Sequence, residues 1–302
     1  MSAPHVVALR ALGLGDLLTA VPALRALRAA YPSTRVKLAG PATLEPLALL
    51  TGAVDEVVDT APLTPMDPAL AGADLAVNLH GRGPESTRLL AATKPRRLIA
   101  YGVDGRVWRP DEHEVRRWCR LLTESGIAAD PGDLDLPRPP VTSPAPGAVV
   151  LHPGAASESR RWPVQRWAQV ARALAADGQR VVISGAPVEA PLTVEVARRA
   201  RLLPEASLAG HTGVLELAAL VAEAATVVCG DTGVAHLATA YRTPSVLLFG
   251  PTPPALWGPP PDRRQHTVLW AGRTGDPHAD APDPGLLEIT TAQVLAAVTC
   301  SG

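Results

Sequence analysis

The sequence has few cysteines, little net charge and no long apolar run. Its 302 residues include only Cys119, Cys229 and Cys300, which lie far apart and lack the C-x-x-C spacing. We therefore expect reduced, mostly buried thiols in a cytosolic protein rather than a disulfide framework or a zinc site. No apolar run reaches the roughly 18 residues that a membrane span needs, and no secretion signal is recognisable at the N-terminus. These absences predict a soluble, cytoplasmic protein, with peripheral contact to the cytoplasmic membrane face left open.

The charge balance argues against nucleic acid as a partner. The formal net charge is -1, and almost all of the positive residues are arginines spread along the chain. A nucleic-acid-binding protein usually concentrates positive charge in a patch or stripe, which this sequence does not show.

The first part of the chain alternates strand and helix signals. Strands are expected at 5–10, 35–39, 56–59, 74–79 and 97–101, and helices at 17–30, 43–50, 85–92 and 111–124. Such a βαβ series predicts a parallel sheet with right-handed crossovers.

A proline-dense segment at 136–147 interrupts this alternation and is interpreted as an interdomain linker. The alternation then resumes. Strands are expected at 148–151, 180–184, 206–209, 226–230 and 245–249, and helices at 164–176, 190–201, 215–224, 232–241 and from Thr290 onward. Segments 251–261 and 272–284 are expected to be loops because they are rich in proline and polar residues. The prediction is an α/β protein with two doubly wound Rossmann-like domains, 1–140 and 148–302, facing each other across a cleft.

The stretch 226–252 carries the most informative pattern, because Asp231 ends an apolar strand and begins a helix. Ligands of open parallel sheets bind at this edge. The unpaired N–H groups of the first helical turn can be capped by Asp231 and Thr232 or shared with oxygens of a ligand. His236 follows one turn later on the same face. A helix cap with a packed histidine remains the alternative interpretation.

Two loops after strands of the first domain are further candidates. Gly13 and Gly15 allow a tight turn before Asp16, which is either a helix cap or a general base in the cleft. No third glycine and no acidic residue at the end of the second strand complete a dinucleotide fingerprint. His80 and Arg82, flanked by glycines, could bind an anionic or polyhydroxyl acceptor or form a plain surface loop.

The loop 152–163 of the second domain resembles a phosphate cradle, because small residues let backbone N–H groups approach an anion. Arg160 or Arg161 would neutralise a pyrophosphate, although a solvated basic turn is the alternative. The loop lacks the Lys-Ser/Thr pair of a Walker motif. Glu216 could accept hydrogen bonds from ribose or interact with the helix dipole. The candidate donor-binding residues of this domain are His152, Gly154, Ala155, Ser157, Arg160, Ser184, Gly185, Glu216, Asp231, Thr232, Gly233 and His236.

Taken together, these motifs resemble glycosyltransferase family 9, the ADP-heptose:lipopolysaccharide heptosyltransferases. The resemblance rests on Gly15-Asp16 followed by Pro22-Ala23-Leu24, on HPGA followed by RRWP, on Leu215 to Glu216, on Asp231-Thr232-Gly233 with His236, and on Phe249-Gly250-Pro251-Thr252. It implies the GT-B fold, with an N-terminal acceptor domain and a C-terminal nucleotide-sugar domain.

The resemblance also implies roles for single residues. Asp16 matches the family's general base. Gly15, His80 and Arg82 are the candidate acceptor-binding residues of the first domain. Arg160 stands where the family usually has a lysine near the donor phosphates, and Glu216 matches the residue that contacts the ribose. The implied reaction is an inverting heptosyl transfer, without metal or cofactor, from ADP-heptose or a related donor to a hydroxyl of a lipopolysaccharide or cell-envelope glycan or glycolipid. A monomer is expected.

A metal-dependent transferase would need a carboxylate pair beside the phosphates. The single D-x-D sequence, from Asp133 to Asp135, lies at the edge of the linker and is interpreted as incidental. Two other classes remain open: a noncatalytic nucleotide-sugar-binding protein and, with less support, an NAD-type oxidoreductase. A serine hydrolase is disfavoured because no G-x-S-x-G turn occurs.

Overall fold

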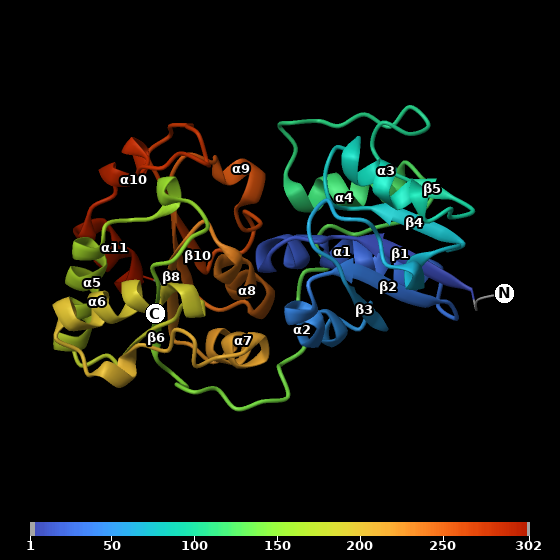
Figure 1. Cartoon of the computed structure of the whole chain (residues 1–302). Helices are drawn as coiled ribbons and strands as arrows, with labels where there is room; N and C mark the ends of the chain where they lie inside the picture. The colour runs from blue at the N-terminus through green and yellow to red at the C-terminus, as the bar shows by residue number, and fades with distance from the viewer. Residues whose placement is uncertain (1–3, 301–302) are drawn as a thin grey trace. The chain divides into compact units, whose positions relative to one another are not determined.

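The computed structural model describes residues 4–300, with side chains through residue 299, and the chain divides into two compact units, Met1–Pro137 and Arg138–Gly302. Each unit is built around its own parallel five-stranded sheet (Figure 1). Segment 136–147, expected as a linker, contains no helix or strand.

The first unit has the strand order β3-β2-β1-β4-β5, with every pair parallel. Its strands are β1 (His5–Leu9), β2 (Arg35–Gly40), β3 (Glu56–Asp59), β4 (Leu75–Asn78) and β5 (Leu98–Ile99). Its helices are α1 (Leu14–Ala30), η1 (Ala42–Leu44), α2 (Glu45–Leu50), η2 (Pro68–Leu70), α3 (Glu85–Ala92) and α4 (Glu114–Thr123). All residues of β1 and β4 are buried, as expected for strands that helices cover on both faces.

The second unit has the order β10-β9-β8-β6-β7, again entirely parallel. Its strands are β6 (Val149–His152), β7 (Val181–Ile183), β8 (Thr226–Gly230), β9 (Ser245–Phe249) and β10 (His266–Trp270). Its helices are η3 (Glu158–Arg160), α5 (Val164–Ala176), η4 (Pro187–Glu189), α6 (Ala190–Ala200), η5 (Pro204–Ala206), α7 (Val214–Ala222), α8 (Gly233–Tyr241), α9 (Pro254–Trp257), α10 (Pro284–Glu288) and α11 (Thr291–Cys300).

Two helical layers enclose the core of the second sheet. Helix α5 packs between α6 and α11, whereas α7 packs against α8 (Figure 1). The ring of Trp167, which belongs to α5, meets the ring of Trp162 edge to face, with the ring centroids 5.3 Å apart. Both rings lie in an apolar cluster with Leu151, Ile183 and Leu248. Aromatic pairs of this kind bury large areas and fix how a helix sits on its sheet.

The structure differs from the element prediction in several places. The strand expected at 206–209 does not form, because Pro204 begins a short 3-10 helix and only Ser207 bridges to Ile183. Strand β10 lies between two segments expected as loops and was not predicted. The first of these segments also contains the short helix α9, and α10 begins at the last residue of the second. Finally, α1 begins at Leu14 instead of residue 17.

Each sheet has one point at which the winding of the chain reverses, between β1 and β4 in the first unit and between β6 and β8 in the second. Open parallel sheets bind ligands just outside the carboxyl ends of the strands at such a point. The loops that follow these four strands therefore define where a ligand site is expected in each unit.

Candidate functional site

Asp16 lies in the first turn of α1, after the loop that leaves β1. The N-cap position of this helix is occupied by Gly13, and no side chain caps it. The alternative interpretation of Asp16 as the cap of this helix is therefore wrong. Its Oδ1 accepts a hydrogen bond of 2.9 Å from Nη2 of Arg10, and the side chain of Asp16 remains 28% exposed.

Arg10, which directly follows β1, is the centre of this site and is only 2% exposed. Its guanidinium donates to the backbone oxygens of Asp16 and Leu79 and to Oε1 of Glu114, the last at 2.9 Å. It also reaches Oγ1 of Thr19 at 3.3 Å. Arg10 was not among the residues predicted from the sequence, although a charged residue that ends an apolar strand is a recognisable signal.

His80 follows β4 and lies beside Arg10. Oδ1 of Asn78 accepts from the His80 backbone N–H at 3.0 Å, and the Asn78 amide donates to Thr87 at 2.9 Å, so this loop is fastened to α3. Burial and the positive charge of Arg10 lower the pKa of His80, which favours the neutral ring. Its buried Nδ1 has no hydrogen-bond partner among residues 4–299.

The first unit thus brings together two of its predicted site residues, Asp16 and His80, around Arg10. Gly15 accompanies Asp16 in the first turn of α1. Arg82 is exposed on the loop after β4.

At the end of β6, His152 is buried, and its Nδ1 lies 3.0 Å from Oγ of Ser184, the residue after β7. Burial lowers the pKa of His152, and the nearby Glu189 partly opposes this. The Glu189 carboxylate fills the space that a side chain on Gly154 would occupy, and it accepts a hydrogen bond of 2.8 Å from the Ala186 N–H. This negative charge makes the vicinity of Gly154 better suited to hydrogen-bond donors than to a phosphate.

Of the two adjacent arginines, only Arg160 is seen to reach the end of β8. Its Nη1 lies 3.3 Å from the backbone oxygen of Asp231 and 3.8 Å from Oδ2 of the same residue. Arg161 turns back instead, donating to the backbone oxygen of Ala155 at 2.9 Å and pairing with Glu158. The structure therefore favours Arg160 as the arginine that could contact a ligand at this strand end.

At the start of α8, Thr232 occupies the N-cap position, and its Oγ1 accepts from Val234 N–H at 3.4 Å. Asp231 precedes the cap, so its interpretation as the helix cap is wrong. It is only 6% exposed. His236 is half-buried one turn into the helix, and its ring meets that of Trp257 at 5.9 Å. Trp257 was missed because its segment was expected to be a loop.

The remaining donor candidates lie around these residues. Ala155 is buried, and Ser157 is half-buried at the N-cap of η3. Gly185 follows Ser184, and Gly233 begins α8. Glu216 is exposed in the first turn of α7, where its carboxylate lies against Gly213.

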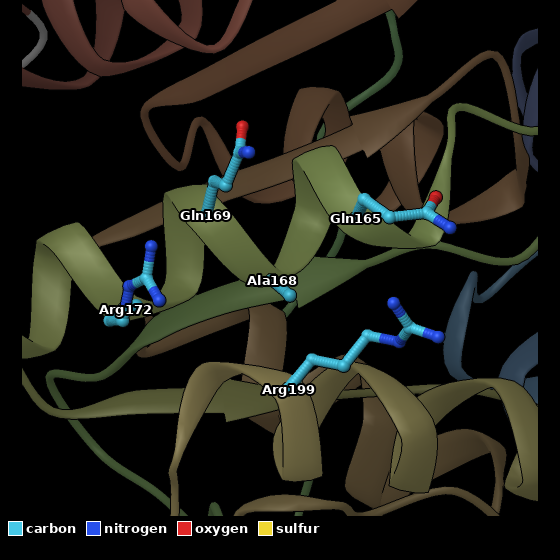
Figure 2. Close-up of a pocket in the computed structure, with 5 residues that line it drawn as sticks. All are labelled: Gln165, Ala168, Gln169, Arg172 and Arg199. Atoms are coloured by element: carbon cyan, nitrogen blue, oxygen red, sulfur yellow. The ribbon is translucent and has the colours of Figure 1, made fainter.

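Two other features do not form part of this site. The D-x-D segment is held by Arg25 of α1, which pairs with Asp133 and donates to the backbone oxygen of Asp135 at 2.8 Å. An open hollow of about 250 Å³ lies between α5 and α6 (Figure 2). It is lined by Gln165, Ala168, Gln169, Arg172 and Arg199. Arg199 is already paired with Glu195, and no lining residue belongs to a strand end.

Within residues 4–299, no cluster of three His, Cys, Asp or Glu side chains is arranged to hold a metal ion. None of the helices described is both long and apolar enough to cross a bilayer. Cys119 and Cys229 are buried free thiols, and burial raises the pKa of each. The side chain of Cys300 lies outside the described residues.

Comparison with known proteins gives consistent matches. The model of the family described as "Glycosyltransferase family 9 (heptosyltransferase)" matches residues 94–284. Lipooligosaccharide heptosyltransferase 2 of Haemophilus influenzae is 30% identical over 175 residues, which cover 49% of this chain and 50% of the relative. The chain thus spans about half the length of the curated relatives it matches.

Solved structures match nearly the whole fold. The ADP-heptose lipopolysaccharide heptosyltransferase II of E. coli has a TM-score of 0.78 at 22% identity, covering 98% of each chain. The E. coli heptosyltransferase WaaC, solved with ADP, has a TM-score of 0.72 at 19% identity, covering 99% of this chain and 100% of that one. These likenesses confirm the GT-B fold class.

Proposed function

This chain belongs to glycosyltransferase family 9, the heptosyltransferases, and on that premise we propose that it transfers a heptose from ADP-heptose to a hydroxyl of a lipopolysaccharide-type glycan or glycolipid. The observation that carries the proposal is the placement of polar residues at the two sheet reversal points. In the first unit these are Asp16 and His80, and in the second they are His152, Arg160 and Asp231.

In the proposed reaction, the Asp16 carboxylate removes the proton of the acceptor hydroxyl as that oxygen attacks the anomeric carbon of the donor. The bond to the nucleoside diphosphate breaks on the opposite face, which inverts the configuration. Negative charge then grows on the departing diphosphate. Arg160 and the N-terminus of α8 are the groups of the second unit suited to stabilise this charge.

Donor and acceptor rest on different kinds of support. The name of the E. coli enzyme II includes ADP-heptose, and WaaC was solved with ADP, which favours an adenine nucleotide as donor. The acceptor is proposed from the names of relatives that act on lipopolysaccharide or lipooligosaccharide. We propose a contribution of His80 and Arg82 to acceptor binding.

The test is an Asp16→Asn variant measured for turnover and for donor binding. Asparagine retains an oxygen for Arg10 but cannot take up the proton, so we expect heptosyl transfer from ADP-heptose to fall by about 10²–10⁴-fold. Thermal stabilisation by ADP should be unchanged in this variant. At about 100 times its dissociation constant, ADP should add roughly 2.7 kcal/mol of stability.

Binding by the second unit is tested in parallel with Arg160→Met and Glu216→Gln, which should weaken stabilisation by ADP but not by an unrelated osmolyte. UDP, GDP and NAD are the nucleotide controls. If ADP fails to stabilise the wild type, or if Asp16→Asn transfers heptose at the wild-type rate, the proposed function is wrong.

A further inference from the structure

We propose that Glu114, acting through Arg10, is a positioning residue for the general base Asp16. The role of Asp16 as general base rests on the proposed function. The electrostatic coupling of Glu114 to Asp16 through Arg10 does not depend on it. Glu114 lies 104 positions after Arg10 in the sequence, and no local sequence pattern connects it with Asp16.

Arg10 links the two carboxylates through one nitrogen. Nη2 donates to Oδ1 of Asp16 and to Oε1 of Glu114, each at 2.9 Å. Nε holds the backbone oxygen of Asp16 at 3.0 Å, and Nη1 holds that of Leu79. The planar guanidinium therefore cannot rotate without breaking several bonds at once, and the orientation of the Asp16 carboxylate follows from it.

Glu114 is itself fixed at the first residue of α4. Its side chain is 6% exposed, and Oε1 also accepts from Nε1 of Trp118 at 2.9 Å. Its other oxygen pairs with Arg117, and Arg117 donates to the backbone oxygen of Glu112 at 2.6 Å. The indole of Trp118 lies beside the Arg10 guanidinium, with the ring centroid 5.0 Å from its central carbon. The anchored end of the network is thus buried, whereas the Asp16 end remains partly open to solvent.

The charges explain why a second carboxylate is useful. The positive charges of Arg10 and Arg117 are paired with the negative charges of Asp16 and Glu114. The charge of Arg10 also acts on His80, whose pKa it lowers. When Asp16 takes up the acceptor proton it becomes neutral, and Arg10 would lose the charge of one partner. Glu114 keeps Arg10 paired in that state, so protonation of Asp16 costs less than it would beside Arg10 alone.

The test is Glu114→Gln, which keeps an oxygen for Arg10 but removes the negative charge and replaces the oxygen that faces Arg117 with an NH2 group. Arg10 should then hold the Asp16 carboxylate in its ionised form more strongly. We expect the acid limb of the kcat profile to move to lower pH and kcat to fall about tenfold, with KM for the donor unchanged.

Glu112→Gln is the matched control. Glu112 pairs with Arg120 at 2.8 Å, and both side chains are 14% exposed. Arg10 pairs instead with Asp16 and Glu114. This variant should keep the wild-type profile. A change of equal size in both variants would indicate a general loss of structure and would overturn the inference.

A second readout does not depend on activity. The carboxyl carbon of Asp16, assigned by comparison with Asp16→Asn, can be followed by NMR during an acid titration of the full chain. We expect its midpoint to fall in Glu114→Gln but not in Glu112→Gln. An unchanged midpoint would refute the positioning role, whereas a shifted midpoint in a protein that transfers no heptose would refute only the proposed function.

A further variant covers the case in which Glu114→Gln does not fold. Arg10→Lys keeps the positive charge but loses the planar fork that joins Asp16, Leu79 and Glu114. A large fall in kcat with unchanged donor KM is expected. Wild-type kcat in this variant would contradict the proposal.

Discussion

His266 at the start of β10 should make the protein lose stability in mild acid. It is 9% exposed, and its Nδ1 lies 2.8 Å from Oγ of Ser245. Burial, followed by the charge of Arg263, lowers its pKa from 6.5 to about 4. The folded protein therefore keeps His266 neutral at a pH at which the unfolded chain would protonate it.

The sign and size of the effect follow from this difference. Between pH 6.5 and 4 the unfolded state binds more protons at this position, so the free energy of unfolding falls as the pH decreases. Above pH 6.5 the contribution is fully present. From the two pKa values, lowering the pH from 7.5 to 5 should cost about 2 kcal/mol at this residue, within the limit of roughly 3 kcal/mol set by the whole shift.

His266→Asn removes the titration while placing an amide near the hydroxyl of Ser245. Urea unfolding followed by tryptophan fluorescence at pH 7.5 and 5 measures the stability difference in each protein. The wild type should lose about 2 kcal/mol more than the variant. Exposed His211, replaced by Asn, is the control and should behave as the wild type does. Equal losses in wild type and His266→Asn would refute the reasoning.

Two further predictions concern the second unit. Gly154→Ala should displace the Glu189 carboxylate, because the new methyl group overlaps it. The free energy of unfolding measured in urea should fall by about 1–3 kcal/mol. If the same substitution costs as much in a Glu189→Ala background, the clash is not the cause. Trp167→Ala should lower the unfolding free energy by about 3–5 kcal/mol, since the ring is 1% exposed and packs on Trp162. Calorimetry of the two variants gives the comparison, and a loss below 1 kcal/mol for Trp167→Ala would contradict the packing argument.

Regular alternation of apolar segments was sufficient to predict most of the fold. The bounds expected for α3 and α5 agree with the structure, because each helix has a clear apolar period and a proline just before it. Strand β10 was not predicted because its run HTVLW lies between two proline-rich segments that were expected to be loops. The predicted strand at 206–209 failed because Pro204 imposes a turn that leaves only one residue in register with β7.

Prediction of the site was limited by distance along the chain. Asp16, His80, Arg160 and Asp231 could be singled out because each follows an apolar strand. Glu114 could not, since its relation to Arg10 appears only once α4 packs on α1. The roles assigned to Asp16, His80, Arg160 and Asp231 in catalysis and binding remain predictions.

The loop that carries Arg160 is fastened across the second sheet. Gly230 ends β8, and Gly250 directly follows β9. A Cβ atom added at Gly230 would lie 3.3 Å from the backbone oxygen of Arg160, and one added at Gly250 would lie 3.4 Å from that of Ser159. The Ser159 backbone also joins the C-terminal segment, donating to Ala279 and accepting from Asp283, each at 3.1 Å.

This fastening has a consequence for recombination between family members. A chimera with its junction anywhere between residues 160 and 279 would take the loop from one parent and the segment that anchors it from the other. Exchange of donor preference should therefore succeed when the whole region from β6 to α10 is inherited together, and shorter grafts should misplace Arg160 even if every ligand-facing residue is copied.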